Sequence, residues 1–395
     1  MSMLTLVNGL VLKGLNLNPV RENVLIANGK ILEIGSNIKE GEIIDAENCI
    51  ISPTFLNGHT HIGDSIIMDE GDSLSLSEMV QPPNGIKHKA LHDADPEDII
   101  NNMRVSMVDM LLSGTTHFID YREGGIEGVK LLKKAAKDIP INPIILGRDS
   151  SFYGENPDMA LVKKHLRKIL KIADGIGLSG FGEINSEVAD LITSQCAKKN
   201  KISSIHTAES QSANNKSIDI TGLSEIERAI DLKFDQVVHC TQASNEDIKK
   251  IKDSNTNLVL APRANACLNI GIPPIKQILN EGISPFIGSD NLMLNSPNIM
   301  RDLEFSLKLT RAYYREYFNP VDFLKMATTN ITKLMLTNKT LYDNIGKSVI
   351  GTGNDAQLMI TKQFSKNPYL SIINRCETQN ILYVMNKDKI IDYSN

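Results

Sequence analysis

The sequence predicts an α/β fold, a (β/α)8 barrel of the TIM type with a small β-sandwich domain built from both chain ends. Three observations lead to this prediction: apolar strand-like runs alternate with helical patterns through the middle of the chain, eight such runs are present, and both ends carry further short strands. Alternating strands and helices are typical of a parallel sheet, and eight parallel strands close into a barrel. A chain of 395 residues is long enough for one barrel and a small second domain.

The two ends of the chain have the same character. Strand-like runs separated by Asn-Gly or Glu-Gly pairs, which favour tight turns, lie at residues 5–7, 24–26, 30–32 and 49–51, and similar runs lie at residues 355–360, 380–385 and 389–391. We therefore expect residues 1–53 and 345–395 to form the two parts of one β-sandwich, and residues 54–344 to form the barrel.

The barrel elements follow in order along the chain. Helix signals separate the strands: Asp95-Pro96 offers an N-cap and a proline at the first helical position. Ser244 with Asp247 forms a capping box, and Ser186-Glu187 opens a third helix. The eight strands are expected near residues 52–58, 115–120, 141–146, 175–181, 202–207, 236–240, 256–261 and 284–289.

Composition excludes several classes of function. The formal net charge of -5 and the pI near 6.0 give no basic surface for nucleic acid. No apolar stretch approaches the roughly 20 residues that a membrane span needs, and the first residues lack the pattern of a secretory signal. Five scattered cysteines without CxxC spacing fit a reducing compartment. We therefore expect a cytoplasmic protein that binds neither nucleic acid nor membrane.

The triplet His59-Thr60-His61 follows the first predicted barrel strand and indicates a metal site. Residues two apart in an extended chain project from the same face, so both imidazoles reach one ion. His206, His239 and Asp290 stand at the ends of three later strands. Barrel active sites lie at the carboxyl ends of the strands, so these side chains are expected to converge.

Other histidines and the loop after the first strand have different expected roles. The segment from Gly63 to about Leu91 is long and polar, and such loops at this end of a barrel usually contact substrate or act as lids. No functional role is assigned to the remaining four histidines, His88, His92, His117 and His165.

The ordered motifs, from the HxH triplet through His206-Thr207-Ala208-Glu209 and His239 to Asp290, resemble the amidohydrolase superfamily, most closely its metal-dependent deaminase and chlorohydrolase branch. The resemblance implies that His59, His61, His206 and Asp290 ligate one divalent ion, with Zn²⁺ expected and Fe²⁺ or Mn²⁺ as alternatives. It also implies that His239 orients a water on that ion.

The same resemblance bears on the number of ions. Binuclear members bridge their two ions with a carboxylated lysine on the fourth strand, whereas residues 175–181 contain no lysine. A single ion is therefore expected, and Glu183 remains the alternative bridging ligand.

Glu209 directs the expected chemistry towards deamination. By the resemblance, this acid protonates a ring nitrogen and carries a proton from water to departing ammonia, while Asp290 also accepts a proton from the attacking water. The expected reaction is release of ammonia from a small aminated heterocycle by metal-bound hydroxide. The alternatives are hydrolysis of an amide or ring C–N bond, displacement of halide, and a binding protein without activity.

Substrate contacts are expected from Arg148, Glu183 and Arg263, the last within Pro262-Arg263-Ala264-Asn265. Glu183 replaces the ribose-contacting histidine of adenosine-type members, so a base-like small molecule is expected, and not adenosine or S-adenosylhomocysteine. Arg122 and Arg148 are either anchors for an anionic substrate group or structural ion-pair partners. The resemblance further implies a homo-oligomer, expected to be a dimer.

Overall fold

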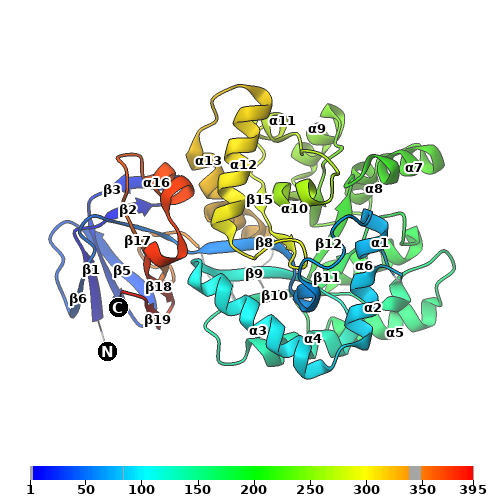
Figure 1. Cartoon of the computed structure of the whole chain (residues 1–395), viewed down its shortest axis with the longest axis horizontal. Coiled ribbons are helices and arrows are strands. Elements are labelled where there is room, and N and C mark those ends of the chain that lie inside the picture. Colours follow the sequence, from blue (N-terminus) through cyan, green and yellow to red (C-terminus); the bar gives the residue numbers. More distant parts are fainter. Residues whose placement is uncertain (1–2, 83, 338–347, 395) are drawn as a thin grey trace.

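The computed structural model describes residues 3–82, 84–337 and 348–394. A barrel and a β-sandwich lie beside each other, and both labelled chain ends lie in the sandwich (Figure 1). The expected fold class is confirmed. The expected boundary between residues 344 and 345 lies outside the described residues, and the division into domains stays a prediction.

The sandwich consists of two sheets, one of which combines both chain ends. The strand orders are β5-β4-β1-β6 and β19-β18-β17-β7-β2-β3. Ile51 of β7 lies opposite Ile360 of β17 in an antiparallel pair, and apolar side chains from both sheets share one buried cluster. The strands are β1 (Met3–Val7), β2 (Leu10–Lys13), β3 (Asn18–Val20), β4 (Asn23–Ala27), β5 (Lys30–Gly35), β6 (Glu42–Asp45), β7 (Cys49–Pro53), β17 (Gln357–Lys362), β18 (Ile381–Asn386) and β19 (Lys389–Asp392).

The barrel is a parallel sheet with the order β15-β14-β13-β12-β11-β10-β9-β8-β16. Its eighth strand is split into β15 and β16; β15 pairs with β14, and β16 pairs with β8, so the sheet closes on itself. The strands are β8 (Phe55–His61), β9 (Thr115–Arg122), β10 (Asn142–Gly147), β11 (Gly175–Leu178), β12 (Ile202–Thr207), β13 (Gln236–His239), β14 (Asn257–Leu260), β15 (Phe286–Ile287) and β16 (Asp290–Asn291).

The closure between the first and eighth strands is held by two polar contacts and one close approach. Asn57 Nδ2 donates to Ser289 Oγ at 2.7 Å, and the Ser289 amide donates to Asn57 Oδ1 at 3.0 Å. A Cβ atom on Gly288 would lie 2.7 Å from the Cβ of His59, so only glycine fits there without displacement. This seam places Asp290 against β8.

Several boundaries differ from those expected. The fourth barrel strand ends at Leu178 instead of residue 181, and the eighth, expected at residues 284–289, is the split pair β15 and β16. Residues 52 and 53 belong to β7 of the sandwich, and the first barrel strand extends through His61, so the HxH triplet lies within the strand. The helix expected to open at Ser186 is capped by Asn185, whose side chain accepts from the Glu187 amide at 2.8 Å. The expected caps at Asp95 and Ser244 are confirmed.

Helices surround the barrel, and two short ones, α1 and α2, lie in the long segment after β8 (Figure 1). No helix within the described ranges is long and apolar enough to cross a bilayer. The α-helices are α1 (Leu76–Val80), α2 (Ile86–Asp93), α3 (Pro96–Leu112), α4 (Gly125–Ala136), α5 (Met159–Ile169), α6 (Ser186–Lys198), α7 (Gln211–Thr221), α8 (Glu225–Asp231), α9 (Asn245–Ser254), α10 (Pro262–Cys267), α11 (Ile275–Asn280), α12 (Ile299–Tyr314), α13 (Pro320–Met326), α14 (Thr332–Thr337) and α16 (Pro368–Arg375). Short 3-10 turns are η1 (Ile62–Ile67), η2 (Ser150–Phe152), η3 (Thr329–Ile331) and η4 (Thr378–Asn380).

Candidate metal centre

Four buried side chains converge at the carboxyl ends of β8, β12 and the split eighth strand: His59, His61, His206 and Asp290. One ligand atom from each lies within 4.8 Å of the others. Asp290 Oδ1 lies 3.1 Å from His59 Nε2 and 3.5 Å from His61 Nε2. Ligands at about 2.0 to 2.2 Å from a common zinc ion are at most about 4.4 Å apart, so small shifts complete the set.

Two of these histidines are held in the tautomer that a metal ligand needs. His206 Nδ1 donates to the Leu178 carbonyl at 2.7 Å, which leaves Nε2 free. His61 Nδ1 lies 3.1 Å from Glu123 Oε1 and 2.9 Å from Arg148 Nη2. The tautomer in which Nδ1 donates to the Glu123 carboxylate leaves Nε2 facing Asp290. A carboxylate or carbonyl acceptor behind a metal-ligating histidine fixes its ring orientation in this way.

Three polar atoms of the cluster have no hydrogen-bond partner among the described residues. Both ring nitrogens of His59 and Oδ1 of Asp290 are buried and accept or donate no hydrogen bond among the described residues. Leaving such groups unsatisfied costs about 1 to 3 kcal/mol each. Three imidazoles and one carboxylate are a donor set that suits zinc and other first-row divalent ions, so the residues present fit an ion.

Burial also sets the protonation of the cluster. It lowers the pKa of His59 and holds the pKa values of His61 and His206 well below the usual range, so these rings are neutral and their lone pairs are available. Burial opposes ionisation of Asp290, but the surrounding imidazoles hold its pKa well below its usual range. The centre therefore consists of neutral imidazoles and a carboxylate.

His239 and Glu209 lie beside this cluster. His239 Nδ1 donates to Asn265 Oδ1 at 3.0 Å. Its Nε2 lies 3.7 Å from Glu209 Oε1 and 3.9 Å from Asp290 Oδ2, without a hydrogen bond among the described residues. Burial raises the pKa of Glu209, which favours the proton-carrying form. Two groups able to move or hold a proton thus border the metal centre.

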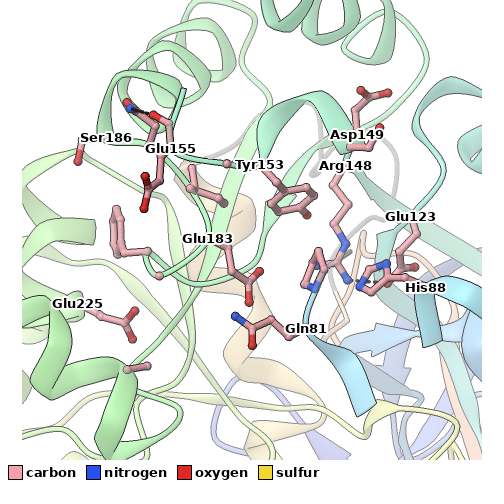
Figure 2. Close-up of a pocket in the computed structure, with 18 of the residues that line it drawn as sticks. Gln81, His88, Glu123, Arg148, Asp149, Tyr153, Glu155, Glu183, Ser186 and Glu225 are labelled. Carbon is pink, nitrogen blue, oxygen red and sulfur yellow. Dashed lines mark hydrogen bonds and ion pairs between the residues drawn. The ribbon is translucent and has the colours of Figure 1, made fainter. Parts of the chain in front are cut away.

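Two adjoining cavities give access to the centre. One of about 810 Å³ is lined by His61, Glu209 and Asp290 among others. The second, of about 1110 Å³, shares Arg148 and Glu183 with the first, and Figure 2 shows Glu183 pointing into it. Together the cavities are large enough for a small molecule that extends well beyond the metal centre.

Glu183 is placed in both cavities as a candidate ligand contact. Its Oε2 atom is buried and has no hydrogen-bond partner among the described residues. Burial raises the pKa of Glu183 to about 7. It is absent from the cluster of metal-ligating groups found in the described part of the chain.

The three arginines singled out in the sequence have different surroundings. Arg148 is buried, and its Nη2 atom donates to Glu123 Oε1 while its Nη1 donates to Ser179 Oγ at 3.0 Å. Arg122 donates from Nε to the Glu123 carbonyl at 3.1 Å and lines neither cavity. Arg122 thus has the contacts of a structural ion-pair partner. Arg148 pairs with Glu123 and also lines both cavities, so its expected substrate contact stays a prediction.

Arg263 turns away from the centre. Its Nε lies 3.1 Å from Asp302 Oδ1, its Nη2 lies 3.0 Å from Asp302 Oδ2, and it is not among the residues that line either cavity. The neighbouring Asn265, which the sequence offered only as part of a pocket-lining motif, is the residue that contacts His239.

Three further residues of the site had no functional assignment from the sequence: Lys87, Glu123 and Asn265. Glu123 stands at the end of β9, and a search of every strand end for acids would have found it. Lys87 lies in the polar segment after β8 without a distinguishing pattern, and only the fold brings it to the site. His88, His92, His117 and His165 are not in the metal-ligating cluster of the described residues.

The barrel and its donor set define a class of protein, the metal-dependent hydrolases. Comparison with known proteins is more specific: the amidohydrolase family matches residues 50–392, and the chain belongs to that family. It is accordingly a hydrolase that acts on carbon–nitrogen bonds other than peptide bonds.

Two similar proteins and one similar solved structure illustrate the comparison. A protein of Methanothermobacter thermautotrophicus, provisionally named an aminohydrolase, is 42% identical over 392 residues, covering 99% of this chain and 100% of its own. A 5-methylthioadenosine/S-adenosylhomocysteine deaminase of Thermoanaerobacter pseudethanolicus is 26% identical over 330 residues, covering 78% and 74%. The zinc complex of atrazine chlorohydrolase from Arthrobacter aurescens superimposes with a TM-score of 0.84 at 15% identity, covering 98% and 94%.

Proposed function

We propose that the protein is an aminohydrolase that releases ammonia from a small aminated heterocycle. The observation that carries this proposal is the position of Glu209 and His239 beside the His59, His61, His206 and Asp290 cluster, in one cavity. The amino group of the substrate must be protonated before it can leave as ammonia. A general acid within reach of the reacting atoms supplies that proton.

The proposed roles follow from the contacts of each side chain. His59, His61, His206 and Asp290 would hold one divalent ion, which when bound lowers the pKa of a coordinated water to about 7 if it is zinc. Glu209 carries a proton between water and the ring or its amino group. His239, oriented by Asn265, presents Nε2 to the same space. Asp290 accepts a proton from the attacking water.

We further propose that Glu183 selects the substrate. Its buried, unpartnered Oε2 atom accepts N–H groups of an amino-bearing or base-like molecule and repels anions. A specific buried acceptor discriminates strongly against ligands that cannot satisfy it. The substrate is therefore expected to be an aminated purine, pyrimidine, pterin or guanidino compound.

Similar proteins support the reaction type. The relative at 42% identity is provisionally named an aminohydrolase and the relative at 26% identity a 5-methylthioadenosine/S-adenosylhomocysteine deaminase, and both names describe hydrolytic removal of an amino group. The function proposed for this protein differs from the name of the second relative only in the substrate. Glu183 is the residue on which that difference rests.

One experiment tests reaction and substrate together. Metal content of the purified protein is measured, and ammonia release is screened over aminated bases, pterins and guanidino compounds, with adenosine and S-adenosylhomocysteine as comparators. We expect one ion per chain and the highest kcat/KM on a base-like compound. Faster release from adenosine or S-adenosylhomocysteine would refute the role of Glu183, and turnover that yields halide or an opened ring without ammonia would refute the deaminase assignment.

A further inference from the structure

A lysine is buried beside the metal centre on the segment that follows β8. Lys87 of α2 is 1% exposed, although lysine is almost never fully buried unless it is paired. Its Nζ atom lies 2.7 Å from Glu123 Oε1 and 3.4 Å from Asp64 Oδ2. Lys87 also lines the cavity that holds His61 and Asp290.

Each of the two carboxylates contacted by Lys87 supports one side of the metal centre. Glu123 Oε1 lies 3.1 Å from His61 Nδ1, which donates to it, and Glu123 thereby orients the His61 ring. The same oxygen also accepts from Arg148 Nη2, so Lys87 and Arg148 hold Glu123 together. Asp64 Oδ2 accepts from Asn291 Nδ2 at 2.6 Å, and Asn291 directly follows Asp290. The Lys87 ammonium group therefore contacts two carboxylates. One is Glu123, which orients His61, and the other is Asp64, which binds Asn291 next to Asp290.

The same helix is part of a cover over the cavity. We define the cover as α1 and α2. Its apolar residues, including Met79 and Ile86, pack in a cluster with Leu268 and Met293. Residues of α1 line the metal-site cavity. Lys87 attaches the cover to the barrel at the metal centre through its contacts with Glu123 and Asp64.

We propose that Lys87 is a positioning residue that couples docking of the cover to the geometry of the His61 and Asp290 ligand pair. This proposal rests on the ligand assignment made above. When the cover is docked, Lys87 holds Glu123 and Asp64 in place and thereby preorganises two ligands. Because coupling between two sites is reciprocal, an ion bound at the centre must in turn stabilise the docked cover.

The direction in which the ion affinity changes on removal of Lys87 distinguishes a positioning role from a purely electrostatic one. Removal of a positive charge near a divalent cation would, by electrostatics alone, strengthen binding of the ion. Loss of a group that orients the ligands weakens it, typically by about 10- to 100-fold for residues behind a metal ligand. The two explanations therefore predict opposite changes for Lys87→Met.

The first test measures Zn²⁺ affinity by competition with a chromophoric chelator, for the wild type, Lys87→Met and Lys89→Met. Lys89 lies on the same helix and is exposed, so it is the matched control. We expect Lys87→Met to bind Zn²⁺ at least about tenfold more weakly and Lys89→Met to bind as the wild type does. Equal or tighter binding by folded Lys87→Met would overturn the proposal.

The second test needs no variant and decides the matter if Lys87→Met does not fold. Hydrogen exchange of the wild-type protein is compared with and without Zn²⁺, using α16, which lies outside the barrel loops, as reference. We expect slower exchange in α2 on addition of Zn²⁺, relative to α16. Unchanged relative exchange in α2 would contradict the coupling.

Neither readout depends on turnover, so the two proposals fail separately. A wild-type protein that binds Zn²⁺ but releases no ammonia would refute the aminohydrolase and leave Lys87 as argued. A wild-type protein that binds no divalent ion would refute both.

Discussion

At the scale of single residues, the centre depends on the hydrogen bond behind three of its four imidazoles. His206 is oriented by the Leu178 carbonyl, His61 by Glu123 and His239 by Asn265. Each acceptor contacts Nδ1, so in all three rings Nε2 faces the centre. Acceptors outside the ligand set therefore decide which nitrogen is available for an ion or a proton.

Glu209→Gln should retain the ion but lose most of the turnover. The amide keeps the shape of the side chain and removes the titratable proton, and general acid–base groups typically contribute about 10² to 10⁴ in rate. The check is kcat for ammonia release together with metal content. Wild-type kcat in a metal-loaded variant would remove Glu209 from the mechanism.

Glu183→Gln should raise KM for a base-like substrate with little change in kcat, because a contact made equally in ground and transition states affects binding alone. At about pH 8.5, above its pKa of about 7, Glu183 is a carboxylate. A hydrogen bond to this charged acceptor exceeds a neutral one by about 1 to 2 kcal/mol, so an increase of about tenfold is expected at that pH. Glu155→Gln is the control, since Glu155 lines the neighbouring cavity but is exposed. An equal change in both variants would contradict a specific contact.

At the scale of elements, the sequence was sufficient to predict the site where metal-ligating or acidic residues stand at the end of a strand. The HxH triplet, the HxxE motif, His239 and Asp290 were predicted as one site, and the structure brings their side chains together. Periodicity predicted eight barrel strands because parallel strands are continuous apolar runs. It misjudged the start of the first strand because β7 and β8 form one apolar run that passes from the sandwich into the barrel.

Other features depend on contacts between distant segments. The close approach of Gly288 to His59 at the split eighth strand joins residues that are far apart in the sequence. Burial of Lys87 requires Glu123 and Asp64, which come from other elements. Arg263 was expected in the pocket, but Asp302 of α12 holds it elsewhere. Sequence spacing carries no signal for any of these pairings.

His117 connects strands of the barrel with the sandwich and should make stability sensitive to acid. Its Nε2 atom accepts from Asn142 of β10 at 2.9 Å and lies 3.3 Å from Gln357 Nε2 of β17. Burial lowers the pKa of His117 to about 3, whereas an unfolded histidine titrates near 6.5. Between these values the unfolded chain binds a proton that the folded chain does not.

The free energy of unfolding should therefore fall as pH decreases through this window, by about 1.4 kcal/mol per pH unit from His117 alone. His117→Gln keeps an acceptor and removes the titration. In urea unfolding of the metal-free protein, this variant should lose about 2 kcal/mol less than the wild type between pH 6.5 and 5. His92→Gln, at an exposed position, is the control, and identical pH dependence in all three proteins would disprove the assignment.

At the scale of the whole molecule, removal of the ion should destabilise the barrel. The proposed ligands come from β8, β12 and β16, so an ion bound only by the folded state joins strands on different sides of the barrel. At a free ion concentration about 1,000 times Kd, the stabilisation is about 4 kcal/mol. Thermal unfolding with and without chelator measures it. His59→Asn should show no chelator-dependent shift in Tm, and a shift of wild-type size in that variant would place the ion elsewhere.

The seam between the first and eighth strands also has a consequence for biosynthesis. The HxH triplet is translated early. Asp290, and Ser289 which contacts Asn57, are translated only after the first seven barrel strands. A nascent chain that has emerged through His239 carries three of the four proposed ligands but an open sheet. If these residues hold an ion as proposed, its uptake is expected to be a late event, completed when the last strand inserts. A prematurely terminated chain is then expected not to retain the metal.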